Sequence, residues 1–215
     1  MQPQNPFTIL LAGRLIDTQR VRLQTAGTRV IAADAGIRHA RTLGLSPELW
    51  VGDFDSASDD DGNGFAEVPR QTHTPAKDMT DGALAIEEAL KRGADALTIV
   101  GAFGGLTDHT FAIMAEACSL SGRIPSILLT SGDEEGWPLR PEPHLFDHPP
   151  GTPFSVLAFS DLKGLTLDGA VWPLDAITMQ FGDTLTISNE VKTQLTARLT
   201  EGRALLVARL APEIS

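Results

Sequence analysis

The sequence predicts two domains: an α/β N-terminal domain, with an open, mainly parallel sheet and flanking helices, followed by an all-β sandwich. In the first part of the chain, short apolar runs alternate with helical patterns, as in βαβ folds. A proline-rich stretch follows, and after it come short apolar runs punctuated by turn residues. With 215 residues, 42% of them hydrophobic, the chain is long enough for two cores.

In the first part, four apolar runs are typical of buried strands: residues 7–12, 30–33, 96–100 and 126–129. Helical patterns lie between or after them, at residues 14–26, 37–43, 77–93 and from 107 onward. The second of these patterns stops at Gly44. In the last helix we expect Phe111, Met114, Ala115 and Cys118 to form one apolar face.

The residues from Trp50 to Ser56 close another apolar run and carry two carboxylates, Asp53 and Asp55. In an extended segment, side chains two residues apart point to the same side. Two adjacent carboxylates suit a hard cation such as Mg2+, which takes oxygen ligands. A surface turn is the alternative, because Gly, Asp and Ser are ordinary turn residues.

Asp34 follows the run 30–33, and therefore lies at the carboxyl end of a predicted strand. Ligands of open α/β sheets bind at these ends, so Asp34 and the Asp53/Asp55 pair are expected to line one crevice. Alternatively, Asp34 caps the helix that follows it.

Lys77, Asp78 and Asp81 cluster at the start of a helix. Carboxylates and an ammonium group at a helix start suit a metal bound together with a phosphate. A capping arrangement, with Asp78 as N-cap and Asp81 at the third helical position, is the alternative.

After the run 96–100 comes a glycine loop with Gly104 and Gly105, which leads into Asp108, His109 and a helix. Glycines let backbone amides approach a phosphate, and a helix N-terminus favours anions. The loop matches neither the P-loop nor the Gly-x-Gly-x-x-Gly pattern. His109 is either catalytic or simply a histidine at a helix start.

Six of the fourteen prolines lie between Pro138 and Pro153, and we place the domain boundary there, with domains at 1–135 and 136–215. The expected strands of the second domain are residues 154–159, 165–167, 176–181, 185–187, 191–199 and 204–210. Trp172 is interpreted as a core residue or a ligand contact. Ser188 and Asn189 are turn residues or ligand contacts.

The composition also restricts location and partners. The chain has 28 acidic against 17 basic side chains, a net charge of -11 and no Lys/Arg-rich block, which disfavours a nucleic-acid partner. Its single cysteine, Cys118, excludes an internal disulfide and suits a reducing compartment. We see no leader pattern and no apolar run near the ~20 residues of a membrane span. The expectation is a cytoplasmic protein without a membrane partner.

Four motifs together resemble the thiamine pyrophosphokinase family. They are Ala33-Asp34-Ala35-Gly36, Gly52-Asp53-Phe54-Asp55-Ser56, Lys77-Asp78-Met79-Thr80-Asp81 and Gly104-Gly105-Leu106-Thr107-Asp108-His109. In the second domain, 169–174 and 188–190 look like further family signatures. Two positions depart from the family pattern: Leu106 stands where Arg is usual, and Ala35 where Gly is usual.

The resemblance implies a homodimer with active sites between subunits, which transfers pyrophosphate from ATP to the thiamine hydroxyl with Mg2+. It implies catalytic and metal-binding roles for Asp53, Asp55 and Asp81, with Asp55 a candidate proton acceptor. The implied ATP-binding residues are Lys77, Asp78, Gly104, Gly105, Asp108 and His109. The implied thiamine-binding residues are Asp34, Ser188 and Asn189.

Three alternatives stay open at this point. One is a pyrophosphokinase for another alcohol, such as a hydroxymethyl pterin. Another is a metal-dependent phosphohydrolase with Asp53 as nucleophile and Asp55 as acid/base. The third is a non-catalytic sensor of thiamine or nucleotide.

Overall fold

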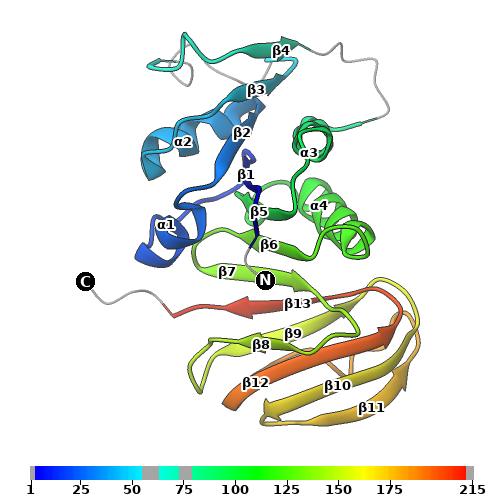
Figure 1. The fold of residues 1–215 in the computed structure, drawn as a ribbon. Coiled ribbons are helices and arrows are strands. Elements are labelled where there is room, and N and C mark those ends of the chain that lie inside the picture. Colours follow the sequence, from blue (N-terminus) through cyan, green and yellow to red (C-terminus); the bar gives the residue numbers. More distant parts are fainter. Residues whose placement is uncertain (1–2, 55–62, 73–78, 212–215) are drawn as a thin grey trace. The chain divides into compact units, whose positions relative to one another are not determined.

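The computed structural model describes residues 3–54, 63–72 and 79–211. The chain forms two compact units (Figure 1). Unit 1 comprises Met1–Ile113 and Ile124–Gly132, and unit 2 comprises Met114–Arg123 and Asp133–Ser215. The expected α/β domain followed by a β-sandwich is confirmed, whereas the domain limits at 1–135 and 136–215 stay a prediction.

Unit 1 is built on a parallel sheet. Its strands are β1 (Pro6–Leu10), β2 (Arg29–Ala33), β3 (Leu49–Gly52), β4 (Arg70–Thr72), β5 (Ala96–Val100) and β6 (Ser126–Thr130). Their order is β6-β5-β1-β2-β3-β4, and each neighbouring pair is parallel. The chain runs outward from β1 to β4 and then returns to the other side of β1. The carboxyl end of β1 is therefore the switch point at which such sheets bind ligands.

Helices cover both faces of this sheet. They are α1 (Gln19–Thr25), the 3-10 turn η1 (Asp34–Gly36), α2 (Ile37–Leu43) and α3 (Asp81–Lys91), while α4 (Thr107–Leu120) begins in unit 1 and continues into unit 2. Figure 1 shows α1 and α2 on one face and α3 on the other. Strands β1, β2 and β5 are buried on both faces along most of their length, which explains why their sequences are continuous apolar runs. In the described part of the chain, no helix is long and apolar enough to cross a membrane.

Local capping fixes where the helices begin and end. Helix α2 has the predicted bounds and ends at Gly44, whose φ of 67° is left-handed. Helix α3 begins later than expected, because the Thr80 side chain accepts a hydrogen bond from the backbone N of Ala83 and is the N-cap. Asp81 is therefore the first helical residue, and its expected place at the third position is wrong.

The predicted apolar face of α4 is only partly correct. Phe111 is 59% exposed, while Ile113, Ala117 and Cys118 are buried. Cys118, which was expected on the apolar face, packs in the interior, and burial raises the pKa of its thiol to about 12. The periodicity of a helix with many apolar residues does not by itself select the buried side.

Unit 2 is a sandwich of antiparallel strands. They are β7 (Glu134–Pro138), β8 (His144–Phe146), β9 (Pro153–Ala158), β10 (Leu162–Ala170), β11 (Leu174–Met179), β12 (Asn189–Glu201) and β13 (Ala204–Arg209). One layer has the order β7-β13-β9, and the other β11-β10-β12-β8. The first residues of β12 pair with β9, so this strand belongs to both layers.

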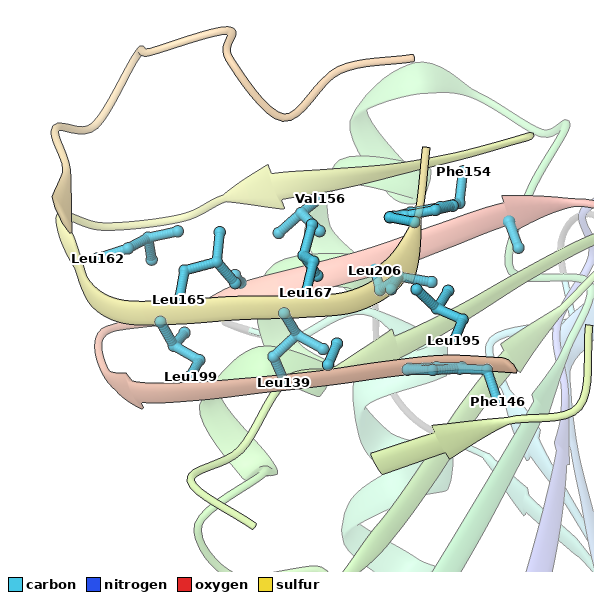
Figure 2. Packing of buried hydrophobic residues seen from close by; sticks show 14 of the residues in the cluster. Leu139, Phe146, Phe154, Val156, Leu162, Leu165, Leu167, Leu195, Leu199 and Leu206 are labelled. Carbon is cyan, nitrogen blue, oxygen red and sulfur yellow. The ribbon is translucent and has the colours of Figure 1, made fainter. Parts of the chain in front are cut away.

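The core of unit 2 lies between its layers. Figure 2 shows Leu165 and Leu167 on β10 near Leu195 and Leu199 on β12, and all four side chains are buried. The strand expected at 185–187 is wrong, because this segment forms turns that leave Leu185 exposed.

Candidate active site

The segment Leu11–Arg14 follows β1 at the switch point and is fixed to the glycine loop. The backbone N of Leu11 donates to the carbonyl of Val100 (2.8 Å), and that of Arg14 to the carbonyl of Phe103 (2.9 Å). Gly101, with φ +74°, packs directly on the Leu11 carbonyl, where a Cβ atom would collide. The end of β1 and the glycine loop therefore form one backbone platform.

Asp34 lies beside this platform in an unusual conformation. It is buried, and its φ of 45° is left-handed, which costs of order 1–3 kcal/mol for a residue other than glycine. The indole Nε1 of Trp50 donates to its carbonyl (2.8 Å) and holds it there. Neither η1 nor α2 has a side-chain cap, so the capping alternative for Asp34 is wrong.

Asp53 is brought to the same place by Gly52. A Cβ atom on Gly52 would lie 3.3 Å from both Cα and Cβ of Asp34, so the ends of β2 and β3 touch here. Behind Asp53, the rings of Phe54 and Trp50 meet edge to face at 5.0 Å. The Arg70 guanidinium covers both rings, 4.5 Å from the Trp50 centroid. Aromatic packing thus fixes the backbone that carries Asp53, while Asp55 lies outside the described residues.

Asp81 joins this edge from the first residue of α3. A Cβ atom on the next residue, Gly82, would lie 3.1 Å from the Leu11 side chain, so α3 begins against the end of β1. A carboxylate at a helix N-terminus is favoured by the helix dipole. Lys77 and Asp78 lie outside the described residues.

The glycine loop presents its exposed side at the start of α4. Gly104, Gly105, Asp108 and His109 are all exposed, and Gly104 has a φ of +69°. The Asp108 carboxylate accepts a hydrogen bond from the backbone N of His109 (2.9 Å). Exposed backbone beside a helix N-terminus suits an anionic ligand.

Two residues of α2 hold the platform and were missed by the sequence analysis. His39 is buried and its Nε2 lies 2.9 Å from the Gly13 carbonyl, so it must carry the proton and donate. Burial lowers the pKa of His39, aided by the charge of Arg38. The Arg38 guanidinium in turn donates to the Ala12 carbonyl. Asp34 was selected because it comes just after a buried strand. The same criterion applies to Ala12–Arg14, which follow β1, and would have indicated that this segment belongs to the site.

The carboxylates at this edge are the oxygen donors that Mg2+ prefers. Asp34, Asp53 and Asp81 come from three different elements that meet around the end of β1. Among residues 3–54, 63–72 and 79–211, no group of three or more His, Cys, Asp or Glu is arranged to hold a metal ion. Since Asp55 is outside these ranges, the metal site of Asp53, Asp55 and Asp81 stays a prediction.

In unit 2, Asn189 fixes the segment that carries Trp172. Its Oδ1 accepts from the backbone N of Trp172 (3.2 Å), and its Nδ2 donates to the Trp172 carbonyl (2.8 Å). Ser188 has a left-handed φ of 65°, and its N donates to the Ser155 hydroxyl (3.0 Å). Trp172 is 61% exposed, so its interpretation as a core residue is wrong. The buried Asn189 side chain thus holds the backbone of a residue whose indole is exposed. From sequence alone, this role of Asn189 cannot be told from that of an ordinary turn residue.

An open α/β sheet with carboxylates and an exposed glycine loop at its switch point, in one chain with a β-sandwich, defines a class of two-domain enzymes. Residues 22–128 match the thiamin pyrophosphokinase catalytic domain, and 144–204 match the vitamin B1 binding domain of the same enzymes. Thiamine pyrophosphokinase of Bacillus subtilis is 30% identical, with 75% of this chain and 77% of that protein covered. The chain belongs to the thiamine pyrophosphokinase family, which confirms the resemblance.

Solved structures agree on the fold. The Bacillus subtilis thiamine pyrophosphokinase has a TM-score of 0.82 at 24% identity and covers 96% of this chain and 100% of its own. The Geobacillus thermodenitrificans thiamin pyrophosphokinase has a TM-score of 0.80 at 22% identity, with 97% of this chain and 99% of that chain covered. The Candida albicans thiamin pyrophosphokinase has a TM-score of 0.77 at only 12% identity, with 96% of this chain and 90% of that chain covered. The architecture is therefore kept at low sequence identity.

Proposed function

We propose that this chain transfers pyrophosphate from ATP to the hydroxyl group of thiamine, with thiamine diphosphate and AMP as products. The observation that carries the proposal is that the elements bearing Asp34, Asp53 and Asp81, together with the exposed glycine loop, all pack around the end of β1. Family membership supplies the two substrates, since the matched segments contain these residues as well as Ser188 and Asn189.

The reaction is a displacement at phosphorus. The thiamine hydroxyl oxygen forms a bond to the β-phosphorus of ATP, and the bond from that phosphorus to the oxygen of the α-phosphate breaks. AMP leaves with the bond's electron pair, and the hydroxyl proton passes to a base, for which Asp55 is the candidate. Positioning and charge stabilisation supply most of the catalysis in such transfers.

At the nucleotide end, the exposed backbone of Gly104 and Gly105 supports the phosphates, aided by the α4 N-terminus. Asp108 and His109 flank the loop, and Lys77 and Asp78 complete the proposed set from outside the described residues. Backbone hydrogen bonds and close packing between the loop and the end of β1 hold Gly104 and Gly105 in place.

Asp53, Asp55 and Asp81 are the proposed ligands of Mg2+. A Mg2+ ion held by these carboxylates would neutralise phosphate charge that the acidic protein would otherwise repel. The carboxylates of this chain are suited to that task because Gly52 and the α3 N-terminus place Asp53 and Asp81 at one edge of the sheet.

At the thiamine end, we assign Asp34, Ser188 and Asn189. A carboxylate at Asp34 suits the amino group and positive charge of thiamine. Asn189 acts through the Trp172 backbone that it holds, and the exposed indole suits a cationic aromatic ring. A cytoplasmic homodimer, in which Ser188 and Asn189 are contributed by the second copy, completes the proposal.

The test is phosphorus NMR of the purified protein with ATP, Mg2+ and thiamine. Thiamine diphosphate with equimolar AMP is the expected result. ADP as the nucleotide product would contradict pyrophosphoryl transfer. ATP cleavage only with another alcohol, such as a hydroxymethyl pterin, would keep the chemistry and replace the acceptor.

A further inference from the structure

Arg14 lies just before the segment matched by the family's catalytic domain. Its backbone N donates to the Phe103 carbonyl (2.9 Å), inside the glycine loop. Gly13, just before it, packs so closely on Gly101 and Phe103 that a Cβ atom would be only 2.8 Å from the Phe103 carbonyl oxygen. The backbone of Arg14 is therefore part of the loop's support.

The side chain of Arg14 runs over Gly104. A Cβ atom on Gly104 would lie 2.8 Å from the Arg14 Cβ and 2.9 Å from its Nε, which belongs to the guanidinium. Gly104 thus has two reasons to be glycine: its left-handed φ of +69° and the passage of this side chain. The contact places a permanent positive charge on the exposed loop, where Arg14 itself is also exposed.

Charge balance makes this cation important. The chain carries a net charge of -11, and Asp34, Asp53, Asp81 and Asp108 all lie at this edge of unit 1. A nucleotide phosphate chain brings several further negative charges. Leu106, where the family resemblance leads us to expect Arg, is 67% exposed and offers no charge.

We propose that Arg14 binds the phosphate chain of the nucleotide on the glycine loop and replaces the arginine that this chain lacks at position 106. The inference rests on the proposed use of ATP. A guanidinium donates paired hydrogen bonds to phosphate oxygens, a geometry that Lys does not reproduce. The contact with Gly104 holds the Nε of Arg14 against the backbone of the loop.

The test uses four variants of the full chain: Arg14→Met, Arg14→Lys, Arg123→Met and the double variant Arg14→Met with Leu106→Arg. Arg123 is the matched control, since it is exposed and follows the other end of α4. We measure the Kd of ATP by calorimetry, the KM values of ATP and thiamine, and the thermal midpoint. AMP, which has a shorter phosphate chain, serves as the second nucleotide probe.

Arg14→Met is expected to weaken ATP about 10- to 100-fold, as for a lost charged hydrogen bond, and AMP less. The KM of thiamine and the thermal midpoint should stay near the wild-type values, the latter within about 2 °C. Arg14→Lys should be intermediate, Arg123→Met unchanged, and the added Leu106→Arg should recover part of the lost affinity.

Wild-type affinity for ATP in Arg14→Met would overturn the inference. So would a loss of affinity that follows a lowered thermal midpoint and that Leu106→Arg does not recover, because this indicates a purely structural role. If the wild-type protein binds ATP but forms no thiamine diphosphate, the proposed function fails while the Kd values still decide the role of Arg14. If it binds no ATP at all, both fail.

Discussion

The two ends of the parallel sheet in unit 1 use charge in different ways. At the amino end, the Glu48 carboxylate accepts hydrogen bonds from Arg29 (2.8 and 2.7 Å) and from Arg92 (2.6 Å). At the carboxyl end, Asp34 and Asp53 are held by their backbone, through the Trp50 indole and the contact with Gly52. Within the described part of unit 1, Asp34 and Phe54 are the residues other than glycine with positive φ.

The difference indicates what each end is optimised for. Hydrogen-bonded ion pairs at the amino end contribute modestly to folding. Strained backbone at the carboxyl end opposes folding and is retained where function requires a fixed geometry. Substitutions of the carboxylates at the carboxyl end should therefore lower activity with little change in stability, whereas those of the ion pairs at the amino end should change stability alone.

The largest effect is expected at Asp53. Asp53→Asn keeps the size of the side chain but removes the charge proposed to hold Mg2+, so kcat/KM should fall at least about 10³-fold. The thermal midpoint should stay within about 2 °C of wild type. Asp168→Asn, on the exposed side of β10, is the control and should keep full activity. A variant of Asp53 that unfolds would show instead that the carboxylate is structural.

The next effect concerns the platform at the end of β1. Gly101→Ala places a methyl group against the Leu11 carbonyl at a φ of +74°, and should lower the free energy of unfolding by about 3 kcal/mol. Gly27 has nearly the same φ, +71°, but nothing within 4 Å of a Cβ atom, so Gly27→Ala should cost about 1 kcal/mol.

Denaturant titration of both glycine variants measures the cost of the steric clash alone, because Gly101 and Gly27 have nearly the same φ. Equal losses of unfolding free energy in Gly101→Ala and Gly27→Ala would mean that φ alone accounts for the effect. The close packing of the glycine loop on Leu11 would then contribute nothing to the rigidity of the site.

A smaller effect is expected at the amino end. Hydrogen bonds from Arg29, opposed by partial desolvation and reinforced by Arg92, lower the pKa of Glu48. Because that side chain is partly exposed, Glu48→Gln should cost only about 1 kcal/mol and leave kcat unchanged. The stabilisation is present above the ordinary carboxyl pKa of about 4.3 and is lost as pH falls through the lowered value.

The control for Glu48 is Glu201→Gln, which removes an exposed pair with Lys163 (2.9 Å) and should change the thermal midpoint less. Thermal melts at pH 7 and pH 3 test both variants against wild type. A difference between Glu48→Gln and wild type that is as large at pH 3 as at pH 7 would contradict the ion-pair explanation.

The smallest effect is the pH dependence of His39. Since burial lowers its pKa, the folded protein favours the neutral ring of His39. Above about pH 6.5, His39 of the unfolded chain is neutral as well. As pH falls below that value, the unfolded chain binds the proton first and stability is lost. Between pH 8 and pH 5, wild type should therefore lose more thermal stability than His39→Gln.

His144, whose pKa is also lowered by burial, is present in both proteins, so its contribution cancels in the comparison. Parallel curves of thermal midpoint against pH for wild type and His39→Gln would refute the assignment to His39. The variant should retain activity at pH 8, because glutamine can also donate to the Gly13 carbonyl.

The sequence was sufficient where one local signal determines the structure. Gly44 ends α2 because a left-handed residue is needed there, and the run 96–100 forms β5 because a strand buried on both faces is apolar throughout. The positions of Asp34 and Asp53 at the carboxyl ends of β2 and β3 could be predicted, since they follow from the topology of parallel sheets, whereas their roles stay a prediction.

Tertiary contacts decided the remaining features. The start of α3 depends on which of several polar residues provides the cap, and Thr80 does so in place of Asp78. The exposure of Trp172 depends on Asn189, seventeen residues away in the chain. His39 acts through a hydrogen bond to Gly13, across a sequence separation of 26 residues. Periodicity and propensity contain no term for such partners.

The alkylation rate of Cys118 can serve as a measure of local opening of α4. It is the sole thiol of the chain, it is 2% exposed, and a pKa of about 12 leaves almost no thiolate at neutral pH. Alkylating reagents will therefore modify the native protein only during transient opening of α4, at a rate that reports how often this happens. The same helix begins at the glycine loop, so nucleotide binding there should lower the alkylation rate of Cys118.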